Sequence, residues 1–338
     1  MNPRFGLGVP TGTEGMMYPV PYATIDEAVE LAVAAEELGY DSVWGNDHLT
    51  TQAYVREEFD QPPNFFDPLS YLTFVAARTQ RIRLATCILV LPFRHPVVAA
   101  KQLATIDQLS RGRLVVGVGI GAYREEFEAL HPGVKLHRGR YAEEALRSLQ
   151  LLFTERRASF DGEFIRFADV ESYPKPVQQP LPLLSGGNSP GSKDRAGRLV
   201  DGWLPACLTP AEVESGLAAI KESADSVDRQ LPDHFEMALQ LGISVAPTRE
   251  EAEERFRSSQ VYKHMESLAG STLKDQQDGD LMSRNLVGTP DEVATQVQAY
   301  LDVGVDTFAG SLFACDTVGE TLKAMELFRD EVMARFTS

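Results

Sequence analysis

An apolar run within residues 41–49 ends abruptly at three polar residues, Asn46, Asp47 and His48. In parallel α/β proteins the catalytic groups gather at the carboxyl ends of strands, because the loops there face one common crevice. His48 can exchange a proton near neutral pH and carries two ring nitrogens that can donate. These residues predict an active site at a strand end. They are equally compatible with an aspartate that caps the following helix beside a surface histidine.

Two segments rich in small residues are candidates for holding a phosphate group. Residues 117–122 match the Gly-x-Gly-x-x-Ala form of a dinucleotide fingerprint, but no βαβ unit with an acidic residue at a second strand end follows them. Gly119 and Gly121 still allow a ligand to approach the backbone, although tight packing inside a barrel explains them equally well. Residues 185–189, Ser-Gly-Gly-Asn-Ser, expose backbone amides immediately before a helix. A helix N-terminus binds anions, so we predict a phosphate site at 185–189.

The composition limits the class of protein. A formal net charge of −17 argues against nucleic acid or an anionic membrane as a partner. Cysteines 87, 207 and 315 are few, odd in number and widely spaced, which fits a reduced compartment. We see no signal peptide and no apolar run long enough to span a bilayer, so we expect a cytoplasmic protein. His131 and His137 have no carboxylate or thiolate at ligand spacing, so no metal site is predicted.

Alternating strands and helices must position these residues. Apolar stretches predict strands at 5–9, 41–49, 83–91, 113–119, 181–185, 202–204, 239–245 and 305–309. Helices are predicted between the strands, and Thr24 with Glu27 and Thr289 with Glu292 form capping boxes at two helix starts. This alternation over residues 1–338 predicts an α/β fold, a single (β/α)8 TIM barrel with insertions, in one domain.

Two stretches depart from the alternation. Residues 158–176 alternate polar and apolar residues around Asp161-Gly162, which is a hairpin signal, and predict an inserted β-ribbon. Residues 270–288, above all the polar stretch 274–285, are predicted to form a mobile loop over the crevice.

Taken together, several of these segments resemble the bacterial luciferase-like family of barrel oxidoreductases, whose members use reduced FMN or the deazaflavin coenzyme F420. The resemblance covers nearly the whole chain. It is carried by residues 43–48, 84–88, 102–113, 117–121, 185–187 and 195–203.

The resemblance implies a role for each matching position. Asp47 and His48 would line the flavin or deazaflavin ring, and a bulge with a non-prolyl cis peptide would lie at Cys87-Ile88 beneath it. The glycines after the fourth strand and the loop at 185–189 would hold the ribityl phosphate. The cofactor-binding residues implied in this way are Asn46, Asp47, Thr86, Cys87, Ile88, Gly119, Gly121, Tyr123, Ser185, Gly186, Gly187 and Asn188.

The choice between F420 and FMN rests on two local features. FMN-dependent members can place an arginine near the end of the fourth strand, whereas residues 119–121 here contain no cation, so F420 is the favoured cofactor and FMN the alternative. Sugar-phosphate dehydrogenases of the F420 branch place a glutamate just after the Gly-x-Gly, where this chain has Ala122. Glu14 or Tyr123 could substitute for it as the proton partner, and nothing in the sequence selects between them. The predicted catalytic residues are His48, Asp47 and Glu14.

The predicted function is hydride transfer between F420 and a small organic substrate. An FMN-dependent monooxygenase is the first alternative, and a family member that binds flavin without turnover is the second. By family resemblance we expect a homodimer.

Overall fold

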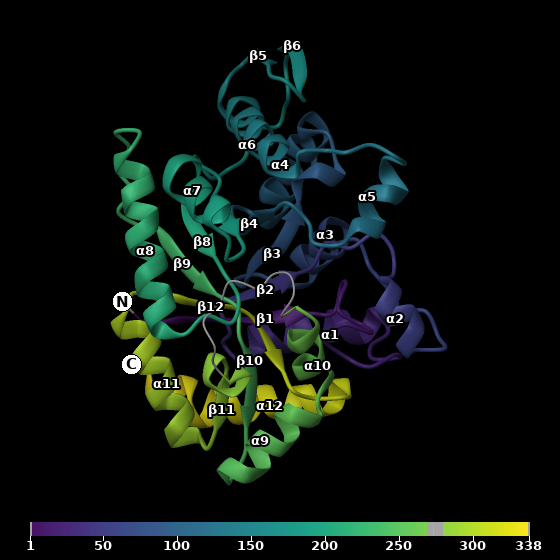
Figure 1. Cartoon of the computed structure of the whole chain (residues 1–338), viewed down its shortest axis with the longest axis vertical. Coiled ribbons are helices and arrows are strands. Elements are labelled where there is room, and N and C mark those ends of the chain that lie inside the picture. The colour runs from purple at the N-terminus through teal and green to yellow at the C-terminus, as the bar shows by residue number, and fades with distance from the viewer. Residues whose placement is uncertain (1, 269–272, 274–279, 337–338) are drawn as a thin grey trace.

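Eight parallel strands form a closed barrel in this computed structural model, which describes residues 2–268, 273 and 280–336 (Figure 1). The barrel closes where the last strand pairs with the first, Arg4 lying opposite Thr307. The predicted (β/α)8 fold is therefore confirmed. In barrel order the strands are β1 (Arg4–Val9), β2 (Ser42–Gly45), β3 (Arg83–Val90), β4 (Leu114–Gly119), β7 (Leu183–Gly186), β8 (Gly202–Leu204), β9 (Glu236–Leu239) and β12 (Thr307–Phe313).

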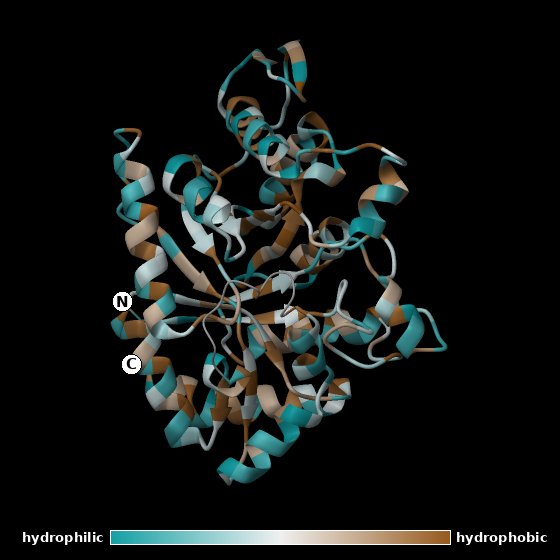
Figure 2. Cartoon of the chain, in the orientation of Figure 1, coloured by the Kyte–Doolittle hydropathy of each residue, from teal (hydrophilic) through white to brown (hydrophobic). Residues whose placement is uncertain are grey.

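Helices surround the strands and bury one apolar face each against them. Figure 2 shows hydrophobic residues concentrated on the central strands and hydrophilic residues on the outer helices. The predicted capping boxes at Thr24 and Thr289 are both present. The long helices are α1 (Ile25–Glu37), α3 (Pro68–Arg78), α4 (Pro96–Ser110), α6 (Arg138–Thr154), α7 (Pro190–Leu199), α8 (Pro210–Asp225), α11 (Pro290–Asp302) and α12 (Val318–Glu331).

Shorter elements complete the chain. The helical segment at 249–267 is divided at Ser259, whose hydroxyl accepts from the backbone N–H of Tyr262 and so starts a new helix. The segment predicted as a ribbon forms the antiparallel strands β5 (Ala158–Asp161) and β6 (Arg166–Val170), which lie beyond α6 at the top of Figure 1. The other short elements are α2 (Ala53–Glu58), α5 (Arg124–Leu130), α9 (Arg249–Ser258), α10 (Gln260–Ser267) and the 3₁₀ turns η1 (Leu91–Phe93) and η3 (Met333–Arg335).

The prediction of a mobile loop at 270–288 is wrong for residues 281–288. Residues there form the 3₁₀ turn η2 (Leu281–Arg284) and the strand β11 (Leu286–Gly288), which pairs with β10 (Gly242–Val245). Asn285 anchors this segment, because its side-chain oxygen accepts from the N–H of Gly242 at 2.7 Å and its amide nitrogen donates to Leu281 O at 2.7 Å. The rest of the predicted loop, 270–272 and 274–279, lies outside the described residues.

The barrel interior is filled by side chains from alternate strand positions. Trp44 is fully buried there, and its indole N–H donates to the Ser42 hydroxyl at 2.7 Å. β1 contributes Gly6, at which a Cβ atom would lie only 2.4 Å from Trp44 Nε1, so the glycine makes room for the indole. The remaining interior residues are Ala85, Cys87, Val115, Leu184, Leu204, Ala238 and Ala309. This filling closes the barrel below the strand ends, so a ligand can enter only above them.

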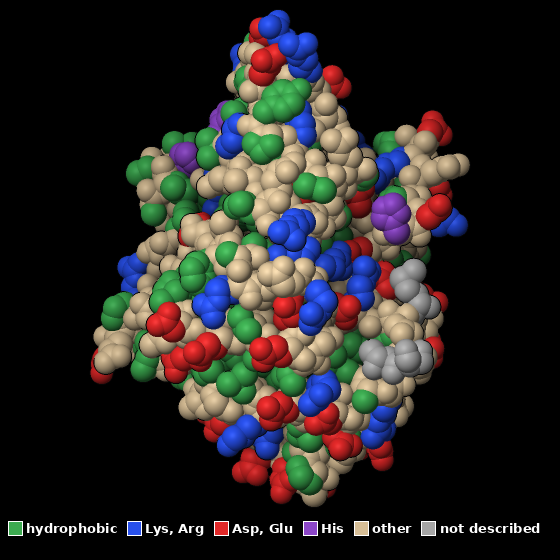
Figure 3. Space-filling model, turned by 180° about the vertical axis from the view of Figure 1, so that it is seen from behind, with side chains coloured by type: hydrophobic (Ala, Val, Ile, Leu, Met, Phe, Trp, Pro, Cys, Tyr) green, Lys and Arg blue, Asp and Glu red, His purple; other side chains and the backbone are tan. Residues whose placement is uncertain are grey.

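Charged side chains are spread over the surface. On the face shown in Figure 3, acidic and basic side chains are interspersed and most dense over the lower half, without a continuous basic area among the described residues. Within the described part of the chain, no helix is both long and apolar enough to cross a membrane.

Candidate active site

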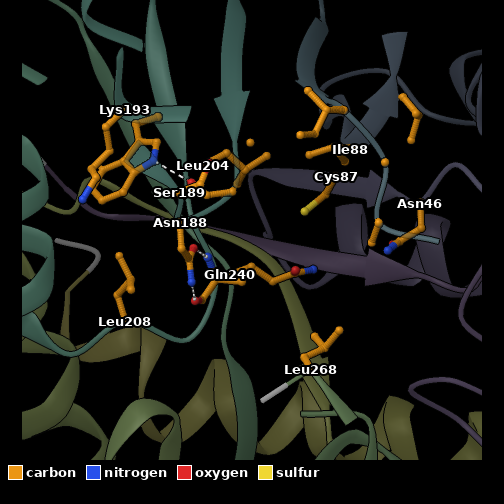
Figure 4. Close-up of a pocket in the computed structure, with 18 of the residues that line it drawn as sticks. Asn46, Cys87, Ile88, Asn188, Ser189, Lys193, Leu204, Leu208, Gln240 and Leu268 are labelled. Carbon is orange, nitrogen blue, oxygen red and sulfur yellow. Dashed lines mark hydrogen bonds between the residues drawn. The ribbon is translucent and has the colours of Figure 1, made fainter. Parts of the chain in front are cut away.

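A cavity of about 920 Å³ lies at the carboxyl ends of the barrel strands. This volume is in the range of small-molecule and cofactor sites. Figure 4 shows side chains from several strand ends around it, with Cys87 and Ile88 from β3 facing Asn188 and Ser189 from the loop after β7. Predicted residues that line the cavity are Asn46, Asp47, His48, Cys87, Ile88, Gly121, Tyr123, Gly186, Gly187 and Asn188. The predicted residues Glu14, Thr86, Gly119 and Ser185 are not among its lining residues.

Asp47 joins the end of β2 to the end of β3. Its carboxylate is 2% exposed and accepts from Val90 N–H at 2.8 Å and from both terminal nitrogens of Arg94 at 2.5 and 3.0 Å. Burial alone would lower the pKa of Arg94, but the hydrogen bond and the charge of Asp47 outweigh it and raise that pKa. A buried carboxylate paired in this way holds the two strand ends together.

His48 forms a pair with a carboxylate that sequence reasoning missed. Its Nδ1 lies 3.1 Å from Oε1 of Glu126, and the same oxygen accepts from Leu49 N–H at 2.8 Å. Glu126 is 1% exposed and comes from α5, one helical turn beyond Ala122. The signal for it was the pair Glu125-Glu126 that follows the glycines, which reads as an ordinary acidic helix start in the sequence.

The peptide bond between Cys87 and Ile88 is cis, and the pairing of β3 with β4 is irregular between Thr86 and Leu89. The predicted bulge with a non-prolyl cis peptide is confirmed. The Ile88 side chain occupies the space that two predicted phosphate glycines leave free. A Cβ at Gly119 would lie 1.8 Å from Ile88 Cδ1, and one at Gly186 would lie 2.4 Å from Ile88 Cγ2. A side chain at either position would clash with Ile88, and this packing requires glycine there whether or not a ligand approaches the backbone.

The loop after β7 has the geometry of an anion site. Gly187 has a φ of +102°, which favours glycine, and its carbonyl accepts from the indole N–H of Trp203 at 2.9 Å. Asn188 is held by two hydrogen bonds to the backbone of Ala206, at 2.8 and 3.0 Å. Ser189 caps α7 by accepting from Ser192 N–H. In the first turn of α7, Pro190 has no N–H and Ser192 and Lys193 donate to Ser189, so Gly191 carries the N–H that has no partner among the described residues. This N–H lies at the helix N-terminus, where the helix dipole favours an anion.

Cations reach this end of the cavity from elsewhere in the chain. Arg195 is 5% exposed and lines the cavity, yet it makes no hydrogen bond or ion pair with any described residue and is attracted only at longer range by Glu143 and Asp194. Burial lowers its pKa. Arg138 also lines the cavity and donates to Gly121 O at 2.7 Å. Residues 119–121 themselves contain no cation, as the sequence shows, but the fold brings Arg138 of α6 against the end of the fourth strand.

Glu14 has a structural role, because its carboxylate accepts hydrogen bonds from three backbone N–H groups. Its carboxylate is 2% exposed and accepts from the N–H groups of Tyr22 at 3.0 Å, Ala23 at 3.0 Å and Asn64 at 2.8 Å. It organises the loop after β1 and lies outside the cavity lining, so the geometry does not favour it as a proton partner. Thr86 and Ser185 likewise direct their hydroxyls to the carbonyls of Gly117 and Ser192.

His264 and an ion pair line the cavity from its other wall. His264 is 6% exposed, and its Nδ1 lies 3.2 Å from the Tyr54 hydroxyl. Burial, with a smaller effect of the nearby His48, lowers the pKa of His264 to about 4, so its imidazole is neutral at neutral pH. Arg284 pairs with Glu212 through contacts of 2.5 and 3.1 Å. Both partners lie far from the predicted motifs in the sequence.

Comparisons with known proteins agree with this geometry. Residues 4–307 match the family model described as luciferase-like monooxygenase, and the chain belongs to this family of oxidoreductase enzymes. An F420-dependent glucose-6-phosphate dehydrogenase of Amycolatopsis mediterranei is 32% identical, over 83% of this chain and 86% of that protein. An FMNH(2)-dependent dimethylsulfone monooxygenase of Pseudomonas putida is 29% identical, over 68% of this chain and 69% of that protein.

Solved structures share the fold. An F420-dependent secondary alcohol dehydrogenase in complex with an F420-acetone adduct superposes with a TM-score of 0.78 at 20% identity, covering 99% of both chains. The monooxygenase RslO1 from Streptomyces bottropensis superposes with a TM-score of 0.79 at 24% identity, covering 99% of this chain and 100% of that one.

The seating of Ile88 can be tested by a double substitution. Gly119→Ala places a methyl group against Ile88 Cδ1, and overpacking of this kind costs about 1–3 kcal/mol of unfolding free energy. Ile88→Val removes Cδ1, so the double variant should recover most of that loss. Urea unfolding of the single and double variants measures the loss of unfolding free energy in Gly119→Ala and its recovery in the double variant. Equal losses in Gly119→Ala with and without Ile88→Val would show that Gly119 is needed for another reason.

The buried His264 predicts a defined pH dependence of stability. Its pKa is about 4 in the folded chain and near 6.5 when unfolded, so between these values the unfolded state binds more protons and stability falls as pH falls. The folded state loses up to about 3 kcal/mol from this group on going from pH 7 to pH 4. In His264→Gln this contribution is absent, so urea midpoints of the variant should approach those of the natural chain as pH decreases. Parallel pH profiles would contradict the assignment.

Proposed function

We propose that this chain binds coenzyme F420 and catalyses hydride transfer between the deazaflavin ring and a hydroxyl- or carbonyl-bearing small molecule. The observation that carries the proposal is a cavity with an anion-receptive end, at Arg195 and the α7 N-terminus, and a proton-exchanging end, at His48. Between them lies the cis peptide at Cys87-Ile88. The relatedness to F420-dependent glucose-6-phosphate dehydrogenases supports F420.

The residues present fit such a cofactor. Arg195 is a desolvated guanidinium without a hydrogen-bonded partner in the described chain, and a phosphate on the α7 N-terminus would supply one. At the opposite end, the side-chain oxygen of Asn46 and one oxygen of Glu126 are buried without a hydrogen-bond partner among the described residues. Orphaned polar atoms around one cavity indicate that a ligand with polar edges completes the hydrogen bonding there.

The chain's own groups would then divide the work. When bound, F420 supplies the ring carbon that accepts or returns a hydride. In the oxidative direction the substrate carbon gives up a hydride, and the hydroxyl gives its proton to Nε2 of His48, which leaves a carbonyl. Asp47 and Arg94 hold the strand ends, and Arg195 binds the anionic tail. Catalysis would rest on positioning and on one proton transfer.

FMN-dependent monooxygenation is the second candidate. Arg138, Lys193 and Arg195 line the cavity and could bind the phosphate of either cofactor, so these cations do not distinguish FMN from F420. The FMNH(2)-dependent relative is matched over a smaller part of the chain than the F420-dependent one. We therefore keep F420 first.

Cofactor titration tests the proposal directly. Fluorescence titration of the purified chain with F420 and with FMN, each oxidised and reduced, should show binding of F420 at least tenfold tighter than of FMN. Equal or tighter binding of FMN would reverse the order of the two candidates.

Arg195→Met should weaken cofactor binding by about tenfold to hundredfold, because a charge-assisted hydrogen bond is lost. The same variant should be as stable as the natural chain or more stable, since a buried unpaired charge is removed. Arg198→Met is the matched control on the same helix, because Arg198 pairs with Asp194 at 2.9 Å. Normal affinity in Arg195→Met would move the phosphate to another loop.

His48→Ala should lower turnover by about 10²–10⁴-fold while cofactor affinity changes little, since a general base is removed. Turnover is measured with F420 against a panel of sugar phosphates and secondary alcohols, the substrate classes in the names of the F420-dependent relatives. An unchanged rate at saturating substrate would remove His48 from the reaction.

We further propose a homodimer. Val98 and Leu109 are 53% and 56% exposed and lie three turns apart on one side of α4, and Phe74 of the neighbouring α3 is 54% exposed. Exposed apolar side chains on two adjacent helices are typical of a subunit interface. Light scattering should give twice the mass of one chain, and Phe74→Glu should give one chain. A monomeric natural chain would exclude the proposal.

A cytoplasmic location remains a prediction from the sequence.

A further inference from the structure

We infer that Glu126 is a positioning residue that fixes the tautomer of His48, so that Nδ1 carries the proton and Nε2 is the acceptor facing the cavity. The inference rests on the proposed function for its catalytic meaning. Its geometry stands independently.

The contacts of Glu126 define the direction of the hydrogen bond. Oε1 lies 3.1 Å from His48 Nδ1 and accepts from Leu49 N–H at 2.8 Å. An ionised carboxylate can only accept, so a neutral imidazole must donate from Nδ1 to it. Since a neutral imidazole carries one ring proton, Nε2 is then an acceptor.

A competing contact is weaker. The side-chain nitrogen of Gln52 lies 3.4 Å from His48 Nδ1, and as a donor it would require the opposite tautomer. That distance is beyond the usual range for a nitrogen donor, whereas the contacts to Glu126 are within it. The side-chain oxygen of Gln52 is buried without a partner among the described residues. If the side-chain amide of Gln52 is turned by 180°, its oxygen takes the place of its nitrogen and can accept from Nδ1–H, which agrees with the tautomer that Glu126 requires.

The remaining nitrogen is available to a ligand. His48 Nε2 makes no hydrogen bond with any described residue, and the imidazole lines the cavity. The ring is confined by Phe65 and Tyr123, whose centroids lie 5.7 Å from it. When Nε2 takes a proton from a substrate hydroxyl, the carboxylate of Glu126 stabilises the resulting imidazolium in a site of low dielectric constant. Glu126 therefore acts through His48 as a positioning residue.

Nitrogen-15 NMR of histidine-labelled protein tests the inference without cofactor or substrate. His48 is assigned by the loss of its signals in His48→Gln. In the natural chain at a pH where His48 is neutral, the proton should reside on Nδ1. A proton on Nε2 would overturn the inference, and this measurement needs no variant of Glu126.

Substitutions separate orientation from charge. Glu126→Leu removes the acceptor and should abolish the preference for the Nδ1 proton, with turnover lower by about 10²–10⁴-fold. Glu126→Gln keeps an oxygen that can accept from both partners and should retain the tautomer, with a smaller loss of turnover. Glu125→Leu is the matched control on α5, because Glu125 accepts from Ala53 N–H at 3.2 Å and does not contact the imidazole. An unchanged tautomer in Glu126→Leu would overturn the inference, whereas failure of F420 binding would affect only the proposed function.

Discussion

The candidate site depends on the buried carboxylate of Asp47. It is almost inaccessible to water, and it takes hydrogen bonds from the backbone of Val90 and from both terminal nitrogens of Arg94. Removing one partner from such a pair leaves an uncompensated charge and typically costs about 3–5 kcal/mol. The ends of β2 and β3 are therefore held together at the point where β3 departs from regular pairing. Asn46 and His48 flank Asp47 in the chain, so this junction holds the backbone that carries them.

Ile88 links the end of β3 to the ends of β4 and β7 by packing. Its side chain crosses from β3 over the ends of β4 and β7, where Gly119 and Gly186 leave the space that it fills. The loop that carries Gly187 and Ser189 is thereby set against the β3 irregularity, and the indole of Trp203 fixes it from β8. A cavity wall built in this way is rigid because each strand end packs on the next. Rigid walls suit a planar ring whose reacting atom must face the substrate.

Charge is distributed unequally around the cavity. Asp47 and Glu212 are paired with Arg94 and Arg284, whereas Arg195 is held in a buried place without a hydrogen-bonded partner in the described chain. An unpaired buried guanidinium is expected to lower stability, which is consistent with our proposal that Arg195 binds the anionic part of the cofactor. His48 differs again, because its carboxylate neighbour leaves one ring nitrogen for a ligand.

Much of this was legible in the sequence because it depends on neighbours along the chain. Apolar runs and capping residues located seven of the eight barrel strands and most helices, and Asn46-Asp47-His48 marked the strand end that opens into the cavity. The predicted seventh strand, 239–245, was displaced, because the barrel strand is β9 (Glu236–Leu239) and most of the predicted run forms β10 (Gly242–Val245). The resemblance of residues 84–88 to a known family located the cis peptide. The sequence did not reveal the roles of three other residues. Glu126 contacts His48, which is 78 residues away in the chain, and Arg138 contacts Gly121, which is 17 residues away. Arg195 makes no hydrogen bond to any described residue, so no neighbour in the chain pointed to its role. For Gly119 the sequence left ligand approach and tight packing equally open, because a missing side chain does not say what fills its place. Local patterns determine which elements form, and only the closed barrel decides which side chains meet above them, because that depends on the packing of strands far apart in the chain.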